Sequence, residues 1–462
     1  MSRFEPGSGA NLRQAGTVKI SLPTALPDSK SGLIVSNNMK PPRKYYLLIP
    51  EKIEELISIW ETNSPFKNFR VDNAVLLLSI ICTHQRKDDN DNFYAQLKME
   101  YLQNRVYNAE KYMRFFKEEG IVTTLGGYVV GEHSYRYQFK EPFYSRYIRK
   151  ELHNQKLKRT VQTAIASEGR KMTRKYPHQK SLLRGMTIDL ENAEKLIWEC
   201  YGSGTSEKEI CQYNYALGSV VRVANKEWIH TIEPTGGRLH TNLTNLPKVL
   251  RCETKINGER LSGIDIRNCE PYLANKILFN PTSGQQFFPG KFPLMKLKCL
   301  RLSEQQDVTH YRLLTSKAQF YKYLETEFNK RGCSYEVISE LKVSKELKQK
   351  IFQIFFANNR YKFKERGIFN ELFPGVDRAF TVLREQNHVH FNNLLTRMQS
   401  HIVLDVILEF INSEYPEMVA LQIHDNITTS IATTDVEKAS EVMNRELTSF
   451  VGVPPSLKVE KF

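Results

Sequence analysis

The chain has 462 residues, of which 40% are hydrophobic, so it is long and apolar enough for two or three packed domains. No apolar run reaches the roughly 18 residues of a membrane span, no signal-peptide pattern opens the sequence, and the seven cysteines include no Cys-x-x-Cys pair. These features argue against a membrane partner, a disulfide framework or a structural zinc site and favour the cytoplasm, while the net charge of +15 favours nucleic acid as the polyanionic partner.

The first 140 residues are expected to comprise a flexible tail and a small domain. Residues 1–43 are rich in Gly, Ser and Pro without periodicity, which predicts the tail. Within 44–140, the pattern predicts helices at 71–83, 93–105 and 107–119, a hairpin over 121–130 and a strand at 135–139. Three helices and a β-ribbon resemble a winged helix-turn-helix, whose last helix enters the major groove. An ordinary α+β packing module is the alternative.

A dense basic tract follows. Residues 140–185 hold 13 Lys and Arg against three Glu, a net charge of +10. Arg170, Lys171, Arg174 and Lys175 lie in this tract, with tyrosines interleaved, which favours contact with a phosphate backbone. A solvated helix face is the alternative. The whole of 141–232 is expected to be mainly helical.

The segment around Asp265 predicts a strand that leads directly into a helix. Leu261, Ile264 and Ile266 form a short apolar run after an Asn-Gly turn, and Pro271 suits the first turn of the helix. Asp265 therefore lies at the end of a buried strand. One interpretation is a helix cap, a position that Asp favours.

The segment 421–428 predicts a hairpin with Asp425 near its turn. Apolar alternation flanks His424, Asp425 and Asn426 on both sides. Two strand-end aspartates, 160 positions apart, are what a two-metal phosphoryl-transfer site needs. The sequence alone thus points to Asp265 and Asp425 as paired carboxylates.

The segment from Thr235 to Pro247, taken with these aspartates, resembles family A DNA polymerases, the group of bacterial DNA polymerase I. Its Thr-Gly-Gly-Arg-Leu run has one extra glycine and a compressed spacing relative to that family. The resemblance implies that Arg238 contacts the primer end. Asp265 and Glu270 keep the family's Asp-x4-Glu spacing, which implies that Glu270 excludes a 2′-hydroxyl and selects deoxynucleotides. A carboxylate in a helix's first turn is also simply favourable electrostatics.

Residues 344–357 resemble the nucleotide-binding helix of that family. Lys348, Phe352 and Phe356 recur at four-residue steps and so share one helix face. The resemblance implies that Lys348 holds the triphosphate while the aromatics stack on base and sugar. Ser344 stands where the family has Arg, with Lys345 nearby, and Ala replaces the closing Gly. An amphipathic core helix is the alternative.

Further segments follow in the family's order. A Phe-Pro-Gly-Val run covers 373–376, Gln399 resembles a glutamine that touches template or primer, and His424 would position the primer end. Asn426 replaces the family's Glu after the second aspartate, a departure that single-subunit phage RNA polymerases share. The final residues match the closing strand of the palm.

The resemblance implies an α+β right-hand polymerase with an N-terminal winged-helix-like domain. The palm would comprise 233–280 and 396–462, the fingers 281–395 and the thumb-like region 141–232, leaving no space for a proofreading exonuclease. Two Mg²⁺ ions, or Mn²⁺, would bind Asp265, Asp425 and the Ile266 carbonyl.

The expected partners are a DNA primer-template and dNTPs, in the replication of a phage, plasmid or mobile element. Alternatives are an RNA polymerase or primase-like enzyme, a template-independent polymerase, and a catalytically inactive DNA-binding initiator.

Overall fold

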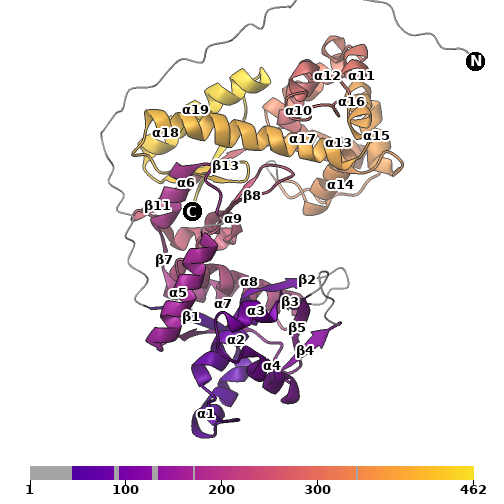
Figure 1. Cartoon of the computed structure of the whole chain (residues 1–462). Coiled ribbons are helices and arrows are strands. Elements are labelled where there is room, and N and C mark those ends of the chain that lie inside the picture. The colour runs from indigo at the N-terminus through magenta and orange to yellow at the C-terminus, as the bar shows by residue number, and fades with distance from the viewer. Residues whose placement is uncertain (1–43, 88–92, 127–133, 170–171, 340–341) are drawn as a thin grey trace, which may run out of the picture. The chain divides into compact units, whose positions relative to one another are not determined.

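The structure is a computed structural model that describes residues 44–87, 93–126, 134–169, 172–339 and 342–462 (Figure 1). The predicted tail at 1–43, residues 127–130 of the predicted hairpin, which include its second arm, and Arg170 and Lys171 lie outside these ranges. Within them, no helix is both long and apolar enough to cross a bilayer.

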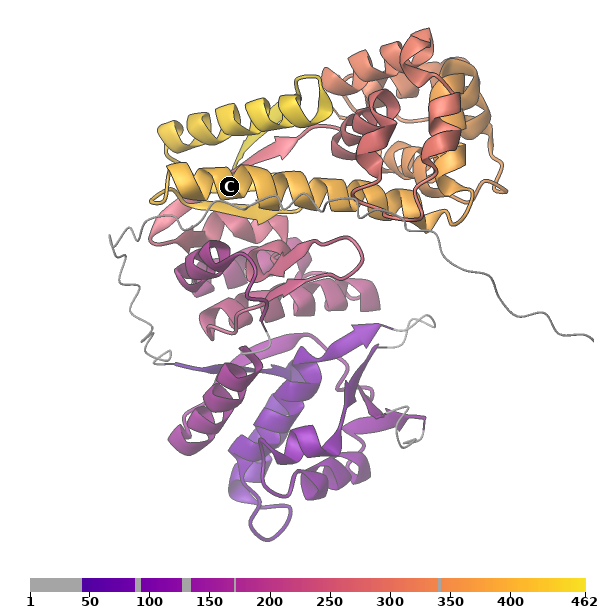
Figure 2. The same cartoon turned by 45° about the horizontal axis from the view of Figure 1, so that its top comes forward.

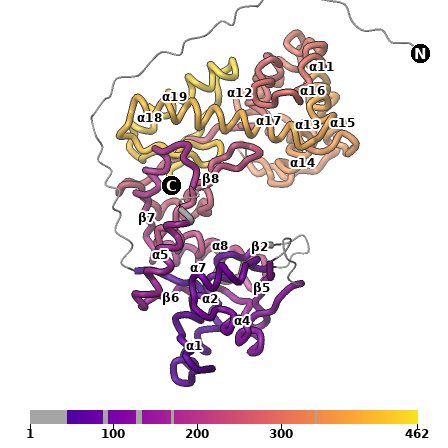
Figure 3. Tube along the Cα trace, viewed as in Figure 1, coloured from indigo at the N-terminus to yellow at the C-terminus, as the bar shows by residue number. Residues whose placement is uncertain are grey.

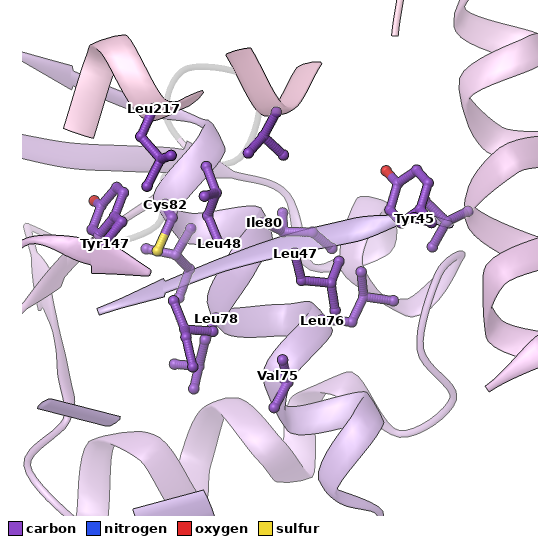
Figure 4. Close-up of a cluster of buried hydrophobic side chains, with 14 of the residues drawn as sticks. Tyr45, Leu47, Leu48, Val75, Leu76, Leu78, Ile80, Cys82, Tyr147 and Leu217 are labelled. Carbon is purple, nitrogen blue, oxygen red and sulfur yellow. The ribbon is translucent and has the colours of Figure 1, made fainter. Parts of the chain in front are cut away.

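The first region combines a four-stranded antiparallel sheet, in the order β2-β3-β5-β4, with helices and a separate strand β1. Its elements are β1 (Tyr46–Pro50), α1 (Glu54–Thr62), α2 (Val71–Thr83), β2 (Gln85–Lys87), β3 (Phe93–Leu97), α3 (Met99–Gln103), α4 (Ala109–Glu118), β4 (Val122–Leu125) and β5 (Tyr135–Phe139). Helix α2 is nearly apolar all round because every residue from Ala74 to Cys82 is buried. These side chains belong to a cluster of buried hydrophobic residues, in which Figure 4 shows Leu47 and Leu48 of β1 beside Leu76 and Ile80 of α2.

The predicted helix at 93–105 is wrong in its first half. Residues 93–97 form β3, which pairs with β5 through Ala95 opposite Tyr137, and only 99–103 are helical. Ala95 and Leu97 are buried while Tyr94 and Gln96 are half-buried, so the period is that of a strand. The distant strand β5 decided the conformation, since local helix propensity is a weak preference.

The other predicted elements of this region are confirmed: α2, α4, and strands β4 and β5, which pair with each other. The winged-helix assignment itself stays a prediction. The structure also contains a β2–β3 hairpin between α2 and α3, which the predicted pattern of three helices and a β-ribbon did not include. The exposed residues of α4 include Lys111, Arg114 and Lys117 but also Glu110 and Glu118, and the exposed Glu119 follows the helix. This outward face is therefore close to neutral, which does not favour α4 as a recognition helix.

The next region is helical with short strands. It contains β6 (Tyr147–Glu151), α5 (Gln155–Gly169), α6 (Pro177–Arg184), β7 (Met186–Ile188), α7 (Leu190–Tyr201) and α8 (Glu207–Ala224). Strand β6 pairs antiparallel with β1, so the chain is hydrogen-bonded across the boundary predicted near residue 140. β7 joins the central sheet at the edge, next to β10.

The central sheet carries both predicted aspartates. Its strands run β12-β13-β11-β10-β7, and β14 pairs with β11 on the side away from β13. These strands are β10 (Thr254–Ile256), β11 (Glu259–Ile266), β12 (Ala420–Ile423), β13 (Asn426–Ser430) and β14 (Leu457–Lys461). Strands β8 (His230–Ile232) and β9 (Leu239–Thr241) form a separate two-stranded sheet, and the helices of this region are α9 (Asn242–Asn245) and α19 (Thr433–Val451). Ile264, Ile266 and Ile427 point into a core shared with α10 and α19, because alternate residues of a strand face opposite sides.

Between β11 and β12, the elements that the structure describes are all helices. The helices are α10 (Cys269–Phe279), α11 (Leu294–Cys299), α12 (Gln306–Ser316), α13 (Phe320–Lys330), α14 (Lys345–Phe356), α15 (Lys364–Leu372), α16 (Pro374–Arg384), α17 (Val389–Ser400) and α18 (Leu408–Glu414). A π-helical segment, His401–Ile407, joins α17 to α18 in one long rod. Figure 2 shows α19 beside this rod, and Figure 3 shows α11 to α16 grouped at its other end.

Candidate active site

Strand pairing brings Asp265 and Asp425 to the same end of the central sheet. Asp265 on β11 lies directly opposite Asn426 on β13. Ile423 pairs with Asn426, so His424 and Asp425 form a two-residue hairpin turn, and His424 has the left-handed φ of 57° that such turns use. Asp425 is the chain neighbour of the residue that faces Asp265. Both predicted elements, the strand and the hairpin, are confirmed.

The helix-cap interpretation of Asp265 is wrong. Helix α10 begins after Asn268, whose φ of 53° turns the chain out of β11, and no side chain caps this end. Asp265 lies within the strand ladder, between Asn426 on one side and Lys458 of β14 on the other. Its carboxylate is therefore not needed to begin the helix.

The carboxylates share a site that is poor in solvent. Burial raises the pKa of Asp425 to about 7, and the negative charges of Asp265 and Glu270 add to that rise. Burial also raises the pKa of Asp265, with Glu460 adding to the rise and Lys458 opposing it. Burial raises the pKa of Glu270 as well. Like charges held together in this way are stabilised by a bound cation.

Arg238 and Gln399 adjoin these carboxylates. The Arg238 guanidinium donates to Gln399 Oε1 at 3.2 Å, and Gln399 Nε2 lies 3.7 Å from the Cys269 thiol. The positive charge of Arg238 partly offsets the raised pKa of both Asp425 and Glu270. Gln399 is buried on α17, so it fixes Arg238 beside the acidic residues.

The extra glycine of the Thr-Gly-Gly-Arg run has a packing reason. A Cβ on Gly236 would lie 2.4 Å from Thr396 Cγ2 on α17. The Ser400 hydroxyl donates to the Gly236 carbonyl at 3.0 Å, and Arg397 donates to the Thr235 carbonyl at 2.7 Å. The turn that carries Arg238 is therefore docked closely against α17.

Cationic groups surround the hairpin turn. The pKa of the His424 imidazole is lowered, first because the surrounding protein excludes part of its water and then by the charges of Arg238, Arg251 and His240. The residue as a whole is nevertheless exposed. Arg251 is half-buried beside the Phe462 ring, with 5.5 Å from its guanidinium to the ring centroid. A neutral imidazole among cations can accept or donate a hydrogen bond at this turn.

Several residues of the site were missed by sequence reasoning. Burial raises the pKa of Tyr321 on α13, and the nearby charge of Glu270 raises it further. No sequence motif surrounds Tyr321. Asn426, in contrast, was noted in the sequence as the replacement for the family's Glu, and its amide packs over Gly263, where an added Cβ would be 2.6 Å from Asn426 Nδ2. Glu460 of β14 forms ion pairs with Lys248 and Lys458 and is the cross-strand neighbour of Gly263. Only the alternation of β14 could have predicted that position.

Helix α14 forms as predicted. Ser344, at the position where the family has Arg, is its N-cap and accepts from the Leu347 amide at 3.2 Å. Lys345 and Lys348 are exposed, and Phe352 is 39% exposed. The core side of the helix consists of Leu347, Ile351, Ile354 and Phe355.

Phe352 therefore lies outside the core, whereas Phe356 is half-buried and packs against it, so the amphipathic-core alternative holds for Phe356 alone. The rings of Phe352 and Phe356 stack at 6.0 Å with 21° between their planes. The helix packs against α13, α15 and α17, and no interaction between the parts that the structure describes joins Lys348 to Asp265 or Asp425.

The described basic residues of the 140–185 tract differ in their surroundings. Arg174 is exposed, whereas Lys175 lies 2.8 Å from Asp405 on the π-helical segment. Tyr176 donates to the same carboxylate at 2.7 Å, and His401 lies 3.1 Å from it. Although burial opposes the shift, these hydrogen bonds hold the pKa of Asp405 well below its usual range. Lys175 therefore contacts the protein itself.

The donor set of the site suits a hard cation. Neither Asp265 nor Asp425 has a hydrogen bond or ion pair to another side chain in the described ranges, and carboxylate oxygens are the ligands that Mg²⁺ prefers. The same ranges contain no group of three or more His, Cys, Asp or Glu side chains arranged to hold a metal. Mg²⁺ commonly takes one or two carboxylates with water and substrate phosphates as its other ligands, so two carboxylates fit it.

Comparison with known proteins gives one kind of match. No known family profile and no curated protein sequence matches the chain. Among solved structures, it is similar to the POL domain of Pol1 from M. smegmatis, in a complex with DNA primer-template and dNTP, at 13% identity and a TM-score of 0.28. The match covers 66% of this chain and 72% of that one. At that TM-score the likeness carries no argument, so the assignment of function rests on the residues themselves.

Proposed function

We propose that the chain is a nucleotidyltransferase, a DNA polymerase of family A type that adds dNTPs to a primer 3′ end. The observation that carries the proposal is the pairing of β11 with β13, which puts Asp265 and Asp425 side by side in a site that raises both pKa values. The primer 3′-oxygen attacks the α-phosphorus of the dNTP, a new phosphodiester bond forms, and the bond to pyrophosphate breaks.

Asp265 and Asp425 hold the charge that this reaction needs. Two Mg²⁺ ions bound at these carboxylates and at the Ile266 carbonyl would activate the 3′-hydroxyl and neutralise triphosphate charge, and Mn²⁺ could replace them. The protein's own part is to hold Asp265 in the strand ladder and Asp425 in the adjoining hairpin turn, so that the two carboxylates stay close together. Lys458, opposite Asp265, balances part of the negative charge of the carboxylates.

Arg238, Gln399 and His424 would position the primer-template. Arg238 is anchored by Gln399 and by the docked turn at Gly236, so its guanidinium is presented at a fixed place beside the carboxylates. Fixed donors next to a reacting centre reduce the entropy lost on reaching the transition state. His424, neutral at physiological pH, would hydrogen-bond the primer terminus from the hairpin turn.

The nucleotide would be held by α14 and by Glu270. Lys348 and Lys345 are exposed cations for the triphosphate, and Phe352 and Phe356 form a stacked pair for base and sugar. Glu270 would exclude a 2′-hydroxyl from the sugar. Tyr321 is its neighbour at this site.

The remaining assignments follow from the same proposal. The central sheet would be the palm, α11 to α16 the fingers and the 141–232 region the thumb, with the basic tract following the DNA backbone. With a winged-helix-like domain before the thumb and without a proofreading exonuclease, as the resemblance implies, the chain would suit replication of a phage, plasmid or mobile element.

Primer extension tests the proposal. The full chain is incubated with a labelled primer-template, each nucleotide set and Mg²⁺, with template omitted in one arm. Asp265→Asn and Asp425→Asn should each abolish extension while binding of primer-template is retained. Glu437→Gln, an exposed carboxylate on α19, is the matched control. Substantial synthesis by either aspartate variant would overturn the site. Extension without template, or with NTPs alone, would favour the other polymerase classes.

A further inference from the structure

The four-stranded sheet β2-β3-β5-β4 has one face turned toward the core of the first region and one face turned away from it. Ala95 and Leu97 of β3 and Tyr137 and Phe139 of β5 are buried in that core. Helix α4 lies on the same side, because Lys117 Nζ is 5.6 Å from the centroid of the Tyr137 ring. Alternate residues of a strand point to opposite faces, so the residues between these four point away from the helices.

The register of the strands determines which side chains share this outer face. Tyr94 of β3 is directly opposite Arg86 of β2, and Gln96 of β3 is directly opposite Arg136 of β5. Strand β4 continues the face on the other side of β5. The outer face thus consists of Arg86, Tyr94, Gln96, Thr123, Leu125, Arg136 and Gln138, each of which is exposed or half-buried.

One aromatic ring lies between two arginines on the outer face. Directly opposed residues of a sheet have Cβ atoms about 4.5–5.5 Å apart, which places Arg86 beside Tyr94. On the other side, the Arg136 guanidinium lies over the Tyr94 ring, 5.1 Å from its centroid. Tyr94 and Arg136 are both half-buried, so part of each remains open to solvent. Aromatic rings and guanidinium planes are the surfaces on which proteins stack unpaired bases.

The outer face is basic from end to end. Lys98 and Lys140 directly follow β3 and β5, continue the outward alternation of those strands and are exposed. Because β3 and β5 are antiparallel, these lysines lie at opposite ends of the sheet. The two lysines and the two arginines form no ion pair with any residue that the structure describes, and none of the described residues of this face is acidic. Such a surface complements a phosphate backbone.

Helix α4 offers nucleic acid a less suitable surface than the sheet does. Its Arg114 lies 3.6 Å from Glu110, and the exposed Glu118 lies near its end. A carboxylate beside a cation offsets the charge that would attract a phosphate. The sheet, and not the helix that a winged-helix domain would place in a groove, therefore combines cations with an aromatic ring.

We propose that the outer face binds a single strand of nucleic acid, with one base stacked on Tyr94 and Arg136 and the neighbouring phosphates on the other cations of the face. Surfaces that combine a basic track with aromatic rings bind single strands, because every base has a face that can stack. Bases in a duplex already stack on each other, so the face selects single strands. The amides of Gln96 and Gln138 donate and accept hydrogen bonds, which suits base edges. The site uses none of the residues assigned to nucleotide addition.

Binding measured without synthesis tests this site. The full chain in EDTA is titrated against labelled oligo(dT) and oligo(rU) of about 20 nucleotides, longer than the roughly 4–16 nucleotides of one such site, and against a blunt duplex. Tyr94→Thr removes the ring but keeps a residue that suits a strand. It should weaken single-strand binding by about 5- to 150-fold, the usual effect of losing one stacked base, with duplex binding within about twofold of wild type. Tyr94→Phe keeps the ring and should retain affinity.

A photochemical measurement on the wild-type chain locates the contact without any substitution. Oligo(dT) and oligo(rU) that carry 5-iodouracil are irradiated in complex with the protein, and the attached peptides are identified by mass spectrometry. A base stacked on the outer face should cross-link to Tyr94, whatever other cross-links form elsewhere in the chain. This arm stays informative if Tyr94→Thr fails to fold.

Matched variants separate the sheet from other parts of the first region. Tyr107→Ala removes a tyrosine that is 84% exposed and lies outside the sheet, and it should leave single-strand affinity unchanged. Arg86→Ala should reduce the slope of log affinity against log salt by about 0.7, the value of one phosphate contact on a single strand. Arg114→Ala, on α4, should leave that slope unchanged. The reverse result for these two arginines would assign binding to the helix and overturn the proposal.

The proposal is also overturned by equal affinity of Tyr94→Thr and Tyr94→Phe for both single strands, by an equal loss on the duplex, or by the absence of a cross-link to Tyr94. A loss confined to oligo(dT) or to oligo(rU) supports the site and identifies its strand. Because Asp265→Asn should abolish extension and leave this binding intact, failure of the proposed polymerase activity and failure of the sheet site are distinguishable.

Discussion

Asp265 and Asn426 face each other across β11 and β13, and this one pair fixes the distance between two aspartates that are 160 positions apart. Asp425 immediately precedes Asn426 in the hairpin turn, so the second carboxylate has little freedom to move away from Asp265. Gly263 contributes by leaving room for the Asn426 amide, which a Cβ would meet at 2.6 Å. The predictions below follow from this arrangement and from the elements around it.

Asp425 should make the metal-free protein less stable as the pH rises. Its pKa is raised from the model-compound value of 3.8 to about 7, so the folded state binds the proton more tightly than the unfolded chain does. The stabilisation from this group is present below about pH 4 and is lost as the pH rises to about 7, by an amount on the order of a few kcal/mol. Denaturant unfolding in EDTA at several pH values measures it. Asp425→Asn should flatten that part of the profile, and an unchanged profile would contradict the burial described here.

Glu270 should govern the choice of sugar. Its half-buried carboxylate lies in the first turn of α10, beside the paired aspartates and Tyr321. A close-packed site rejects an added hydroxyl by steric cost, and each 1.4 kcal/mol corresponds to about tenfold in discrimination. Glu270→Ala should therefore raise ribonucleotide relative to deoxynucleotide incorporation by at least about tenfold, measured as a ratio of kcat/KM values. Tyr321→Phe serves as control for the neighbouring hydroxyl. If wild type uses both nucleotides equally, Glu270 is no gate.

Lys348 should contribute to nucleotide binding. It is exposed on the face of α14 that also carries Phe352, and the opposite face forms the core. Lys348→Ala should raise the KM for dNTP by about tenfold or more, since a charge-assisted hydrogen bond contributes about 1.5–3 kcal/mol. Gln349→Ala, exposed on the same helix but uncharged, is the matched control and should behave as wild type. Equal effects of the two changes would mean that the helix is merely destabilised.

The basic tract should contribute unequally to salt-dependent binding. Arg174 is exposed, whereas Lys175 is engaged by Asp405 at 2.8 Å. Arg174→Ala should reduce the slope of log affinity against log salt by about 0.7–0.9, the value of one phosphate contact, and Lys175→Ala should reduce it less. Neutralising Arg170, Lys171, Arg174 and Lys175 together should weaken binding to all sequences alike. A slope that none of these changes affects would make the tract a solvated face.

Gly236→Ala should destabilise the protein by about 1–3 kcal/mol, the usual cost of overfilling a packed contact. The added Cβ would lie 2.4 Å from Thr396 Cγ2, on a β-branched side chain that cannot rotate freely in its helix. Thr396→Ala removes that methyl group and should recover part of the loss in the double variant. Denaturant unfolding measures each variant. Additive losses in the double variant would show that the two residues do not contact each other.

The sequence by itself determined the elements whose signals are local. The apolar alternation around Asp265, the hairpin at Asp425, the helix α2 and the four-residue steps of α14 each predicted the element that the structure contains. Such patterns are visible because side chains repeat every two residues in a strand and every 3.6 in a helix. The paired carboxylates could be named on this basis, together with Arg238 and Gln399 from the family resemblance.

Only the tertiary structure decided which residues meet. Residues 93–97 became a strand because β5 was available to pair with them, and β6 crossed a predicted boundary to reach β1. Tyr321, Glu460 and the contact of Lys175 with Asp405 join residues far apart in the chain. Hydrogen bonds between strands and ion pairs between distant elements leave no periodic trace in a sequence, because they depend on the register that the whole fold selects. The two aspartates could be identified from the sequence, but the environment that they share could not.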